Sequence, residues 1–413
     1  MNLVIPKKVA LAPLFFFLVL VCLPIVDNLT GALFKLKLMS EGAIGSPSQL
    51  VRFILFTAVV WLVNNEKNNK SLPKILLVTC YLFAVELVLA CFHMNFKAFL
   101  SGIVFSIKIL FALCCYCYIA NWIDFNKQRT VYVIKQIINY GTIVAVLVLL
   151  AYLSGFHISN YKIGIATRGL FISGNGLGIV LGISTILLVH FSRNISLLWL
   201  LHIFLLMATT ALLGTKASLV FLMVALALLS LKLAKQAPII TVIVLTFFSI
   251  YFLLPLIDIL SALFENIIYK FTNIDDKLTL IASSRDLFIK NAFAEMKVEA
   301  LYALRVLFGG GAYYAYTDFT VGNTILRKSL ENDLFELFFS YGIVSVVAYI
   351  SIYIYAIKAC FIKRNFIITL SLTLVFLHSI LMGHVLFNGT SAITYALCLA
   401  VAAKGEGVRA DDF

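Results

Sequence analysis

Apolar runs separated by short polar hinges make up most of this chain, and one hydrophilic stretch, residues 258–332, interrupts them. A helix needs about 20 mainly apolar residues to cross a bilayer. Runs such as residues 143–151 show neither the alternation of a barrel strand nor the amphipathic pattern of a soluble core helix. The pattern predicts an all-α polytopic membrane protein with about twelve transmembrane helices, at residues 9–26, 49–63, 75–92, 99–121, 137–155, 171–190, 196–214, 217–232, 238–257, 333–357, 366–384 and 389–403.

Composition supports this class of protein. Hydrophobic residues make up 62% of the 413 residues, charged residues only 12%, and the mean hydropathy is +1.04. A soluble domain carries about 25% charged residues. The chain therefore divides into nine transmembrane helices over residues 1–257, a large loop over residues 258–332, and three transmembrane helices with a short tail over residues 333–413.

The positions of lysine and arginine predict the orientation, because cationic short loops stay on the cytoplasmic side. In a twelve-helix arrangement one side collects most short-loop cations, namely Lys7, Lys8, Lys67, Lys70, Lys74, Lys127, Arg129, Lys135, Arg193, Lys232, Lys235, Lys358, Lys363, Arg364, Lys404 and Arg409. Both termini are thus predicted to be cytoplasmic and residues 258–332 to lie outside. The net charge of +13 follows mainly from this topology and from contact with membrane lipids, and no nucleic-acid module accompanies it.

The outside loop contains one predicted helix, at about residues 284–304. Ser283 and Asp286 are spaced as in a capping box with Asp in place of Glu, and apolar residues follow at mostly helical spacing. Gly309–Gly311 would end this helix in a turn, where a backbone without side chains can adopt positive φ or approach a ligand closely. A plain linker that stops the helix is the alternative.

Cations at the predicted outer ends of helices suggest an anionic ligand. Arg168 precedes the sixth predicted helix, and Lys216 lies in the short turn between the seventh and eighth. Arg285 opens the loop helix, and Arg327 precedes the tenth transmembrane helix. Guanidinium groups bind phosphate oxygens bidentately and lysine adds a point charge, so a diphosphate would fit. Alternatively, each cation extends to the lipid headgroups from the membrane interface.

Five pieces of sequence between residues 165 and 350 occur in a characteristic order. They are Arg168 with Asn175, the turn Thr215–Ser218, the pair Ser284–Arg285, the cluster Gly309–Gly311, and Glu331–Phe335 followed by Tyr341–Gly342. In this order they resemble the O-antigen polymerase and O-antigen ligase superfamily of bacterial envelope glycosyltransferases. Outside residues 165–350 the likeness is one of general hydropathy only.

This resemblance implies a GT-C-like glycosyltransferase of the bacterial inner membrane that needs neither a metal nor a cofactor. An acceptor sugar hydroxyl would attack the anomeric carbon of a glycan linked to undecaprenyl diphosphate, and undecaprenyl diphosphate would leave. A chain-length regulator protein is a further expected partner. The motifs HExxH, paired CxxC and the Walker loop do not occur in the sequence.

The resemblance also implies roles for particular residues. We expect Glu331 to take the proton of the acceptor hydroxyl, with Asp333 as the second choice. Glu331 could instead pair with a cation of its own segment, Arg327 or Lys328. The remaining predicted contacts to substrate are cations that bind the diphosphate and two amides that bind other parts, namely Arg168, Lys216, Arg285 and Arg327, and Asn175 and Asn332.

One difference between this sequence and the ligases indicates which branch of the superfamily it resembles. Ligases, which transfer finished glycan to lipid A core, typically have a His-Asn pair before the tenth helix, where this chain has Glu331 and Asn332. The acidic variant is more similar to the polymerases, which join repeat units. We therefore favour a polymerase and keep a ligase as the alternative.

A lipid-linked oligosaccharide flippase, or another transporter, is the alternative from a different class. Transporters often contain internal repeats, and residues 1–200 and 201–413 show none. Glu86 and Lys108 lie at similar depths in adjacent helices, and we expect them to form a buried ion pair. His378 and His384, in and at the end of the eleventh helix, are expected to be packing or interfacial residues and not ligands.

Overall fold

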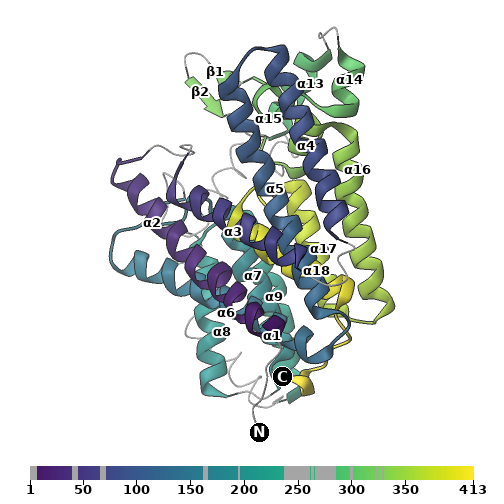
Figure 1. Cartoon of the computed structure of the whole chain (residues 1–413). Coiled ribbons are helices and arrows are strands. Elements are labelled where there is room, and N and C mark those ends of the chain that lie inside the picture. Colours follow the sequence, from purple (N-terminus) through teal and green to yellow (C-terminus); the bar gives the residue numbers. More distant parts are fainter. Residues whose placement is uncertain are drawn as a thin grey trace. The chain divides into compact units, whose positions relative to one another are not determined.

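The computed structural model describes residues 7–39, 45–65, 71–160, 166–193, 196–236, 261, 265, 285–297, 301–317, 319–321, 324–327 and 330–413. Within these ranges the secondary structure is helical, apart from an isolated antiparallel bridge between Ser159 and Thr167 and one antiparallel hairpin of strands β1 (Phe319–Val321) and β2 (Thr324–Arg327) (Figure 1). Some predictions, including the transmembrane helix at residues 238–257, lie outside the described residues.

Eight described helices are long and apolar enough to cross a membrane, so the chain is a polytopic helical membrane protein. They are the continuous segment Leu11–Lys35, α3 (Pro47–Asn64), α4 (Leu72–Phe92), α5 (Phe96–Ile123), α6 (Lys127–Leu153), α7 (Gly174–Phe191), α9 (Lys216–Gln236) and α16 (Asp333–Ile362). Shorter apolar helices are α8 (Leu197–Leu212), α17 (Phe366–Leu381) and α18 (Gly389–Lys404). Each of these segments overlaps one range predicted from hydropathy.

Two helices extend well beyond their predicted ranges because polar residues continue them. The N-terminal segment, predicted to end at residue 26, runs through α1 (Lys7–Phe17), the π-helix η1 (Leu18–Cys22) and α2 (Leu23–Lys35). Asp27 stays buried there because its carboxylate accepts a hydrogen bond of 2.6 Å from Ser48. α6 was predicted to begin at residue 137 and begins at Lys127, where Asn126 caps it by accepting from the Arg129 N–H at 3.0 Å.

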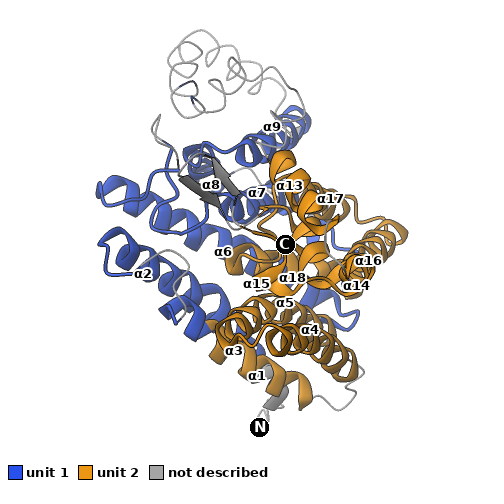
Figure 2. Cartoon of the chain, turned by 90° about the horizontal axis from the view of Figure 1, so that it is seen from above, with its two compact units in different colours: residues 1–51, 122–273, 405–413 blue, residues 52–121, 274–404 orange. Residues whose placement is uncertain are grey.

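The chain divides into two compact units that alternate along the sequence (Figure 2). Unit 1 comprises residues 1–51, 122–273 and 405–413, and unit 2 comprises residues 52–121 and 274–404. In unit 1, α7 packs against α6, α8 and α9, and nearly all of its residues are buried. Glycines permit this packing, since a Cβ on Gly141 would come within 2.2 Å of the Ser184 hydroxyl.

Residues 405–413 complete unit 1. The Lys127 ammonium lies 2.8 Å from the Asp412 carboxylate, and the Phe413 ring stacks on Phe191 with centroids 4.8 Å apart. The backbone N–H of Glu406 donates to the Thr130 hydroxyl at 3.2 Å. This tail is therefore part of the packed unit.

Unit 2 is organised around α16, which contacts α14 (Tyr302–Phe308), α15 (Gly311–Tyr314), α17 and α18. Its helical geometry is interrupted at Tyr341 and at Gly342, where φ is 68°. A Cβ on Gly342 would lie 2.1 Å from the Leu307 carbonyl oxygen, and one on Gly309 would lie 2.3 Å from the Ser340 carbonyl. Glycine at these two positions lets the end of α14 pack backbone to backbone against the interruption in α16.

The single helix predicted at residues 284–304 is replaced by two helices, which corrects that prediction. α13 (Arg285–Lys297) occupies most of the range, and α14 begins only at Tyr302. Gly309–Gly311 follows α14, and the N–H of Gly310 donates to the Phe339 carbonyl at 2.8 Å. The glycines thus serve a close backbone approach, which hydrophobic periodicity does not reveal.

Candidate functional site

A polar cap at the start of α16 organises the candidate site in unit 2. Asn332 is the N-cap residue, and its Oδ1 accepts from the Phe335 N–H at 3.2 Å. Its amide nitrogen donates to the carbonyl of Ile380 in the last turn of α17. Asn332, which was predicted to bind substrate, therefore joins the beginning of α16 to the end of α17. An N-cap hydrogen bond of this kind stabilises a helix by about 1 kcal/mol.

Asp333 fixes the segment between α17 and α18, residues 382–388, which we call the α17–α18 loop. Its Oδ2 accepts three hydrogen bonds, from the Ser379 hydroxyl at 3.0 Å, the Val385 N–H at 2.9 Å and the Leu386 N–H at 3.2 Å. The side chain is buried, with 1% of its surface exposed. These contacts favour a positioning role for the residue predicted as the second-choice base.

The backbone is unusual where the α17–α18 loop meets the segment before α16. Glu331 and His384 have φ values of 52° and 63°, a left-handed conformation that few residues other than glycine adopt. Gly383, at φ 63°, lies against Glu331, and a Cβ on it would come within 2.5 Å of the Glu331 carbonyl. Such conformations cost on the order of 1 kcal/mol each and are concentrated at functional sites.

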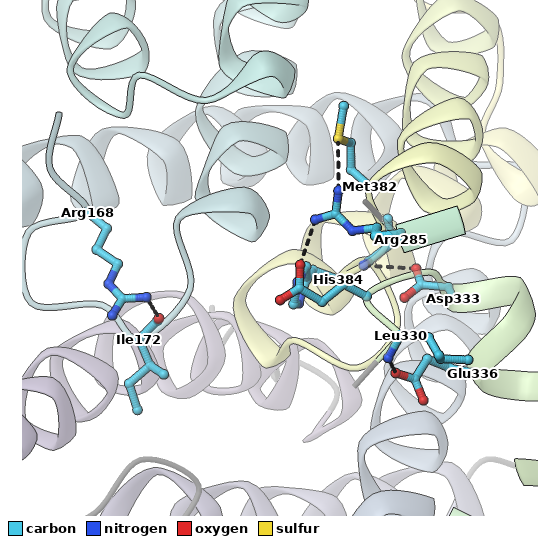
Figure 3. A network of polar contacts seen from close by, with 10 residues as sticks. Arg168, Ile172, Arg285, Leu330, Asp333, Glu336, Met382 and His384 are labelled. Carbon is cyan, nitrogen blue, oxygen red and sulfur yellow. Dashed lines mark hydrogen bonds and ion pairs between the residues drawn. The ribbon is translucent and has the colours of Figure 1, made fainter. Parts of the chain in front are cut away.

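Three charged or titratable side chains meet at this place, each from a different element. Figure 3 labels two of them, Arg285 and His384. An Arg285 Nη2–Glu331 Oε2 distance of 2.7 Å defines a charge-assisted hydrogen bond. His384 Nε2 lies 3.8 Å from the same carboxylate oxygen. The exposed fractions of the side chains rise from 6% for Arg285 through 18% for Glu331 to 24% for His384. This cluster combines a fixed cation, a carboxylate and an imidazole, which are the groups needed for acid–base chemistry on an anionic substrate.

Arg285 is held in place by its own helix. It is the first residue of α13, and Nη1 lies 3.7 Å from the Met382 sulfur of the α17–α18 loop, as Figure 3 shows. Farther along α13, Ala292 and Met296 are buried in an apolar cluster with Phe339 of α16. Packing of α13 on α16 therefore fixes the guanidinium position.

A second carboxylate of α16 supports the segment that carries Glu331. Glu336 accepts from the Leu330 N–H at 2.7 Å through Oε1 and from the Tyr316 hydroxyl at 2.7 Å through Oε2. Figure 3 shows the contact with Leu330. Leu330 precedes Glu331, so Glu336 restrains the backbone next to the cluster.

Further cations approach the α17–α18 loop from α3 and α5 of unit 2. A Cβ on Gly389, at the end of this loop, would lie 2.0 Å from the Arg52 guanidinium. Lys108 lies over the Phe105 ring, 6.0 Å from its centroid, and Phe105 stacks on Phe387 of the loop at 4.4 Å. Lys108 interacts electrostatically with Arg52 and Glu336. These cations add positive charge beside the loop and were not predicted as site residues.

The predicted ion pair between Glu86 and Lys108 is wrong. Both residues are described, and Glu86 instead accepts from the Tyr341 hydroxyl and from the Ala312 N–H, each at 2.8 Å. The Tyr81 hydroxyl donates to the Tyr341 carbonyl at 2.6 Å. Similar depth in adjacent helices did not decide the partner, because Tyr341 of α16 and Ala312 of α15 each offer Glu86 a hydrogen-bond donor.

Three of the predicted substrate-binding residues belong to unit 1. Arg168 donates to the Ile172 carbonyl, as Figure 3 shows, and Asn175 is the second residue of α7. Lys216 is the first residue of α9, whose start is capped by reciprocal side-chain to backbone hydrogen bonds of 3.0 and 3.1 Å between Thr215 and Ser218. Their joint use with Arg285 remains a prediction, since Arg285 belongs to unit 2.

Of the predicted residues, unit 2 brings Arg285, Glu331, Asn332 and Asp333 together. Arg327 lies in β2, but its side chain is not among those that the structure describes. His384 was expected to be a packing or interfacial residue, and the structure places it opposite Glu331. Its place at the end of a predicted transmembrane helix was the available signal, but the sequence could not show which polar residue it would meet.

Comparisons with known proteins identify no relative. No protein-family model, no curated protein and no solved structure matches the chain.

Proposed function

We propose that this chain is a polysaccharide polymerase of the bacterial inner membrane. It would transfer glycan from undecaprenyl diphosphate to a sugar hydroxyl of a lipid-linked repeat unit at the outer face, with both termini in the cytoplasm. The observation that carries this proposal is the Arg285–Glu331–His384 cluster at the start of α16. It supplies a carboxylate and an imidazole for proton transfer next to a fixed cation.

Charge around the cluster suits an anionic donor. Arg52 and Lys108 lie beside the α17–α18 loop, and polyprenyl diphosphate carries its charge at the membrane surface where such a loop would lie. Arg168, Lys216 and Arg327 are the further candidates for the diphosphate. Cations positioned on a leaving diphosphate stabilise the charge that develops as its bond to the sugar breaks.

The glycan profile of a strain without the gene tests the proposed function. Loss of a polymerase should leave single repeat units on the cell surface. Loss of a ligase should instead accumulate long polymer on undecaprenyl diphosphate with none on lipid A. Lipid-linked units that stay on the cytoplasmic side would identify a flippase, and an unchanged profile would contradict all three.

Two substitutions in α13 then test whether the activity depends on the Arg285–Glu331–His384 cluster. Arg285→Ala removes a buried guanidinium that contacts Glu331, and we expect complementation with this variant to restore only single repeat units. Lys290→Ala is the matched control on α13, because that side chain is 67% exposed and lies 3.9 Å from Asp286. Long chains with Arg285→Ala, or their loss with Lys290→Ala, would contradict the site assignment. Membrane amounts of both variants must equal those of the wild type.

A further inference from the structure

Glu331 forms an ion pair that works against its use as the proton acceptor. Its Oε2 lies 2.7 Å from Arg285 Nη2, and both side chains are largely shielded from water. A guanidinium at this distance favours the ionised carboxylate over the protonated one. Accepting a proton would weaken this pair and leave the buried Arg285 charge poorly compensated.

His384 is the better placed acceptor of the cluster. Imidazole is the side chain that exchanges protons most readily near neutral pH. His384 is also the most exposed of the three, at 24%. Its Nε2 faces Glu331 Oε2 at 3.8 Å, so the carboxylate favours the tautomer with the proton on Nε2 and the lone pair on Nδ1.

The backbone of the α17–α18 loop holds the imidazole in this position. His384 has φ 63°, and the adjacent N–H of Val385 is bound by Asp333 at 2.9 Å. The Ser391 hydroxyl donates to the His384 carbonyl, and Gly383 packs on the Glu331 backbone. Catalytic side chains need this kind of support, since small displacements reduce the rate strongly.

Building on the polymerase function above, we propose that His384 takes the proton of the acceptor hydroxyl, and that Glu331 is a positioning residue held by Arg285. The acceptor O–H proton moves to Nδ1 of His384 as the oxygen forms a bond to the anomeric carbon. The bond between that carbon and the diphosphate oxygen breaks, and its electron pair leaves with undecaprenyl diphosphate. The imidazolium formed is stabilised by the facing Glu331 carboxylate.

Purified full-length chain in liposomes, with an undecaprenyl-diphosphate-linked oligosaccharide as substrate, tests this assignment. His384→Gly suits the positive φ and leaves space where the ring was, so the variant should fold and lose on the order of 100-fold in rate. Added imidazole should restore part of the rate, and among substituted imidazoles the restored rate should change with their basicity. His384→Asn, which tolerates the same φ, should be folded, inactive and not rescued.

His93→Ala is the control, because that exposed imidazole stacks on Tyr314 at 4.1 Å. Wild-type rates for His384→Gly, or a loss that no imidazole rescues, would overturn the proton-transfer role. A wild-type chain that forms no glycosidic bond would instead contradict the proposed function, and this assignment with it.

Discussion

Gly383 packs directly on the backbone of Glu331, so that a Cβ at position 383 would lie 2.5 Å from the Glu331 carbonyl. This contact joins the α17–α18 loop to the segment before α16. It also sets the separation between Glu331 and the next residue of the loop, His384. The conformation of one glycine thus determines whether carboxylate and imidazole can face each other.

Gly383→Ala should displace Glu331 and reduce polymerisation by roughly tenfold or more, as small displacements of reacting groups do. Gly155→Ala is the matched control, because Gly155 has a similar φ of 71° but nothing within 4 Å of the added Cβ. Both variants carry a backbone penalty of about 1 kcal/mol, but only the first carries the clash. Equal activity and equal unfolding temperature of the two variants would refute the importance of the contact.

Asp333→Asn should keep most of the activity, whereas Asp333→Ala should lose stability and activity together. An amide oxygen can still accept from Ser379, Val385 and Leu386, but alanine leaves these donors without their partner. Each buried donor left unsatisfied costs about 1–3 kcal/mol. Transferase assays and thermal unfolding in detergent provide the measurements. An inactive but fully stable Asp333→Asn variant would show that the carboxylate takes part in proton transfer.

Glu86→Gln should fold as the wild type does, and Glu86→Ala should be less stable by roughly 2 kcal/mol. The oxygen Oε1 of Glu86 accepts both of its hydrogen bonds, from Tyr341 and Ala312, and a glutamine oxygen can do the same. Chemical denaturation of the purified chain measures the difference. If Glu86→Gln alone abolished transport or transfer without loss of stability, the charge of Glu86 would have a function beyond packing.

Acidification should weaken unit 1 through His157, which lies between α6 and α7. Burial, and then the nearby Lys35, hold the pKa of His157 below its ordinary value of 6.5. The unfolded chain therefore binds more protons at low pH, so stability is full above 6.5 and decreases as the pH falls below it. Unfolding midpoints at about pH 7.5 and about pH 5.5 should differ less in His157→Gln than in the wild type. An unchanged difference would assign the acid sensitivity to other groups.

Hydropathy predicted the apolar helices because crossing a membrane depends on local composition. It placed the start of α6 and the end of α2 wrongly, where a cap at Asn126 and a buried hydrogen bond of Asp27 continue the helix with polar residues. The sequence also singled out Arg285 and Glu331, since charged residues next to apolar helices are conspicuous. It could not find their contact or that of His384, because several elements separate these residues along the chain and only the fold brings them together.

Contacts between backbone segments also could not be predicted from the sequence. Gly309 and Gly342 lie against carbonyl groups of distant segments. Glu86 accepts a hydrogen bond from Tyr341, at the interruption of α16, and does not pair with Lys108. Neither the close glycine contacts nor the interruption of α16 produces a periodic pattern of apolar residues in the sequence. Glycine and tyrosine positions indicate that something unusual occurs, but only the fold shows which segment approaches.

The alternation of the two units along the chain constrains biogenesis. Residues 405–413 belong to unit 1 but follow all of unit 2 in the chain, so Asp412 can reach Lys127 only after unit 2 has been synthesised. While unit 2 is inserted, the earlier segments of unit 1 therefore lack their contacts with residues 405–413. A nascent chain arrested within α18 would lack every contact that residues 405–413 make with unit 1, including those with Lys127, Thr130 and Phe191.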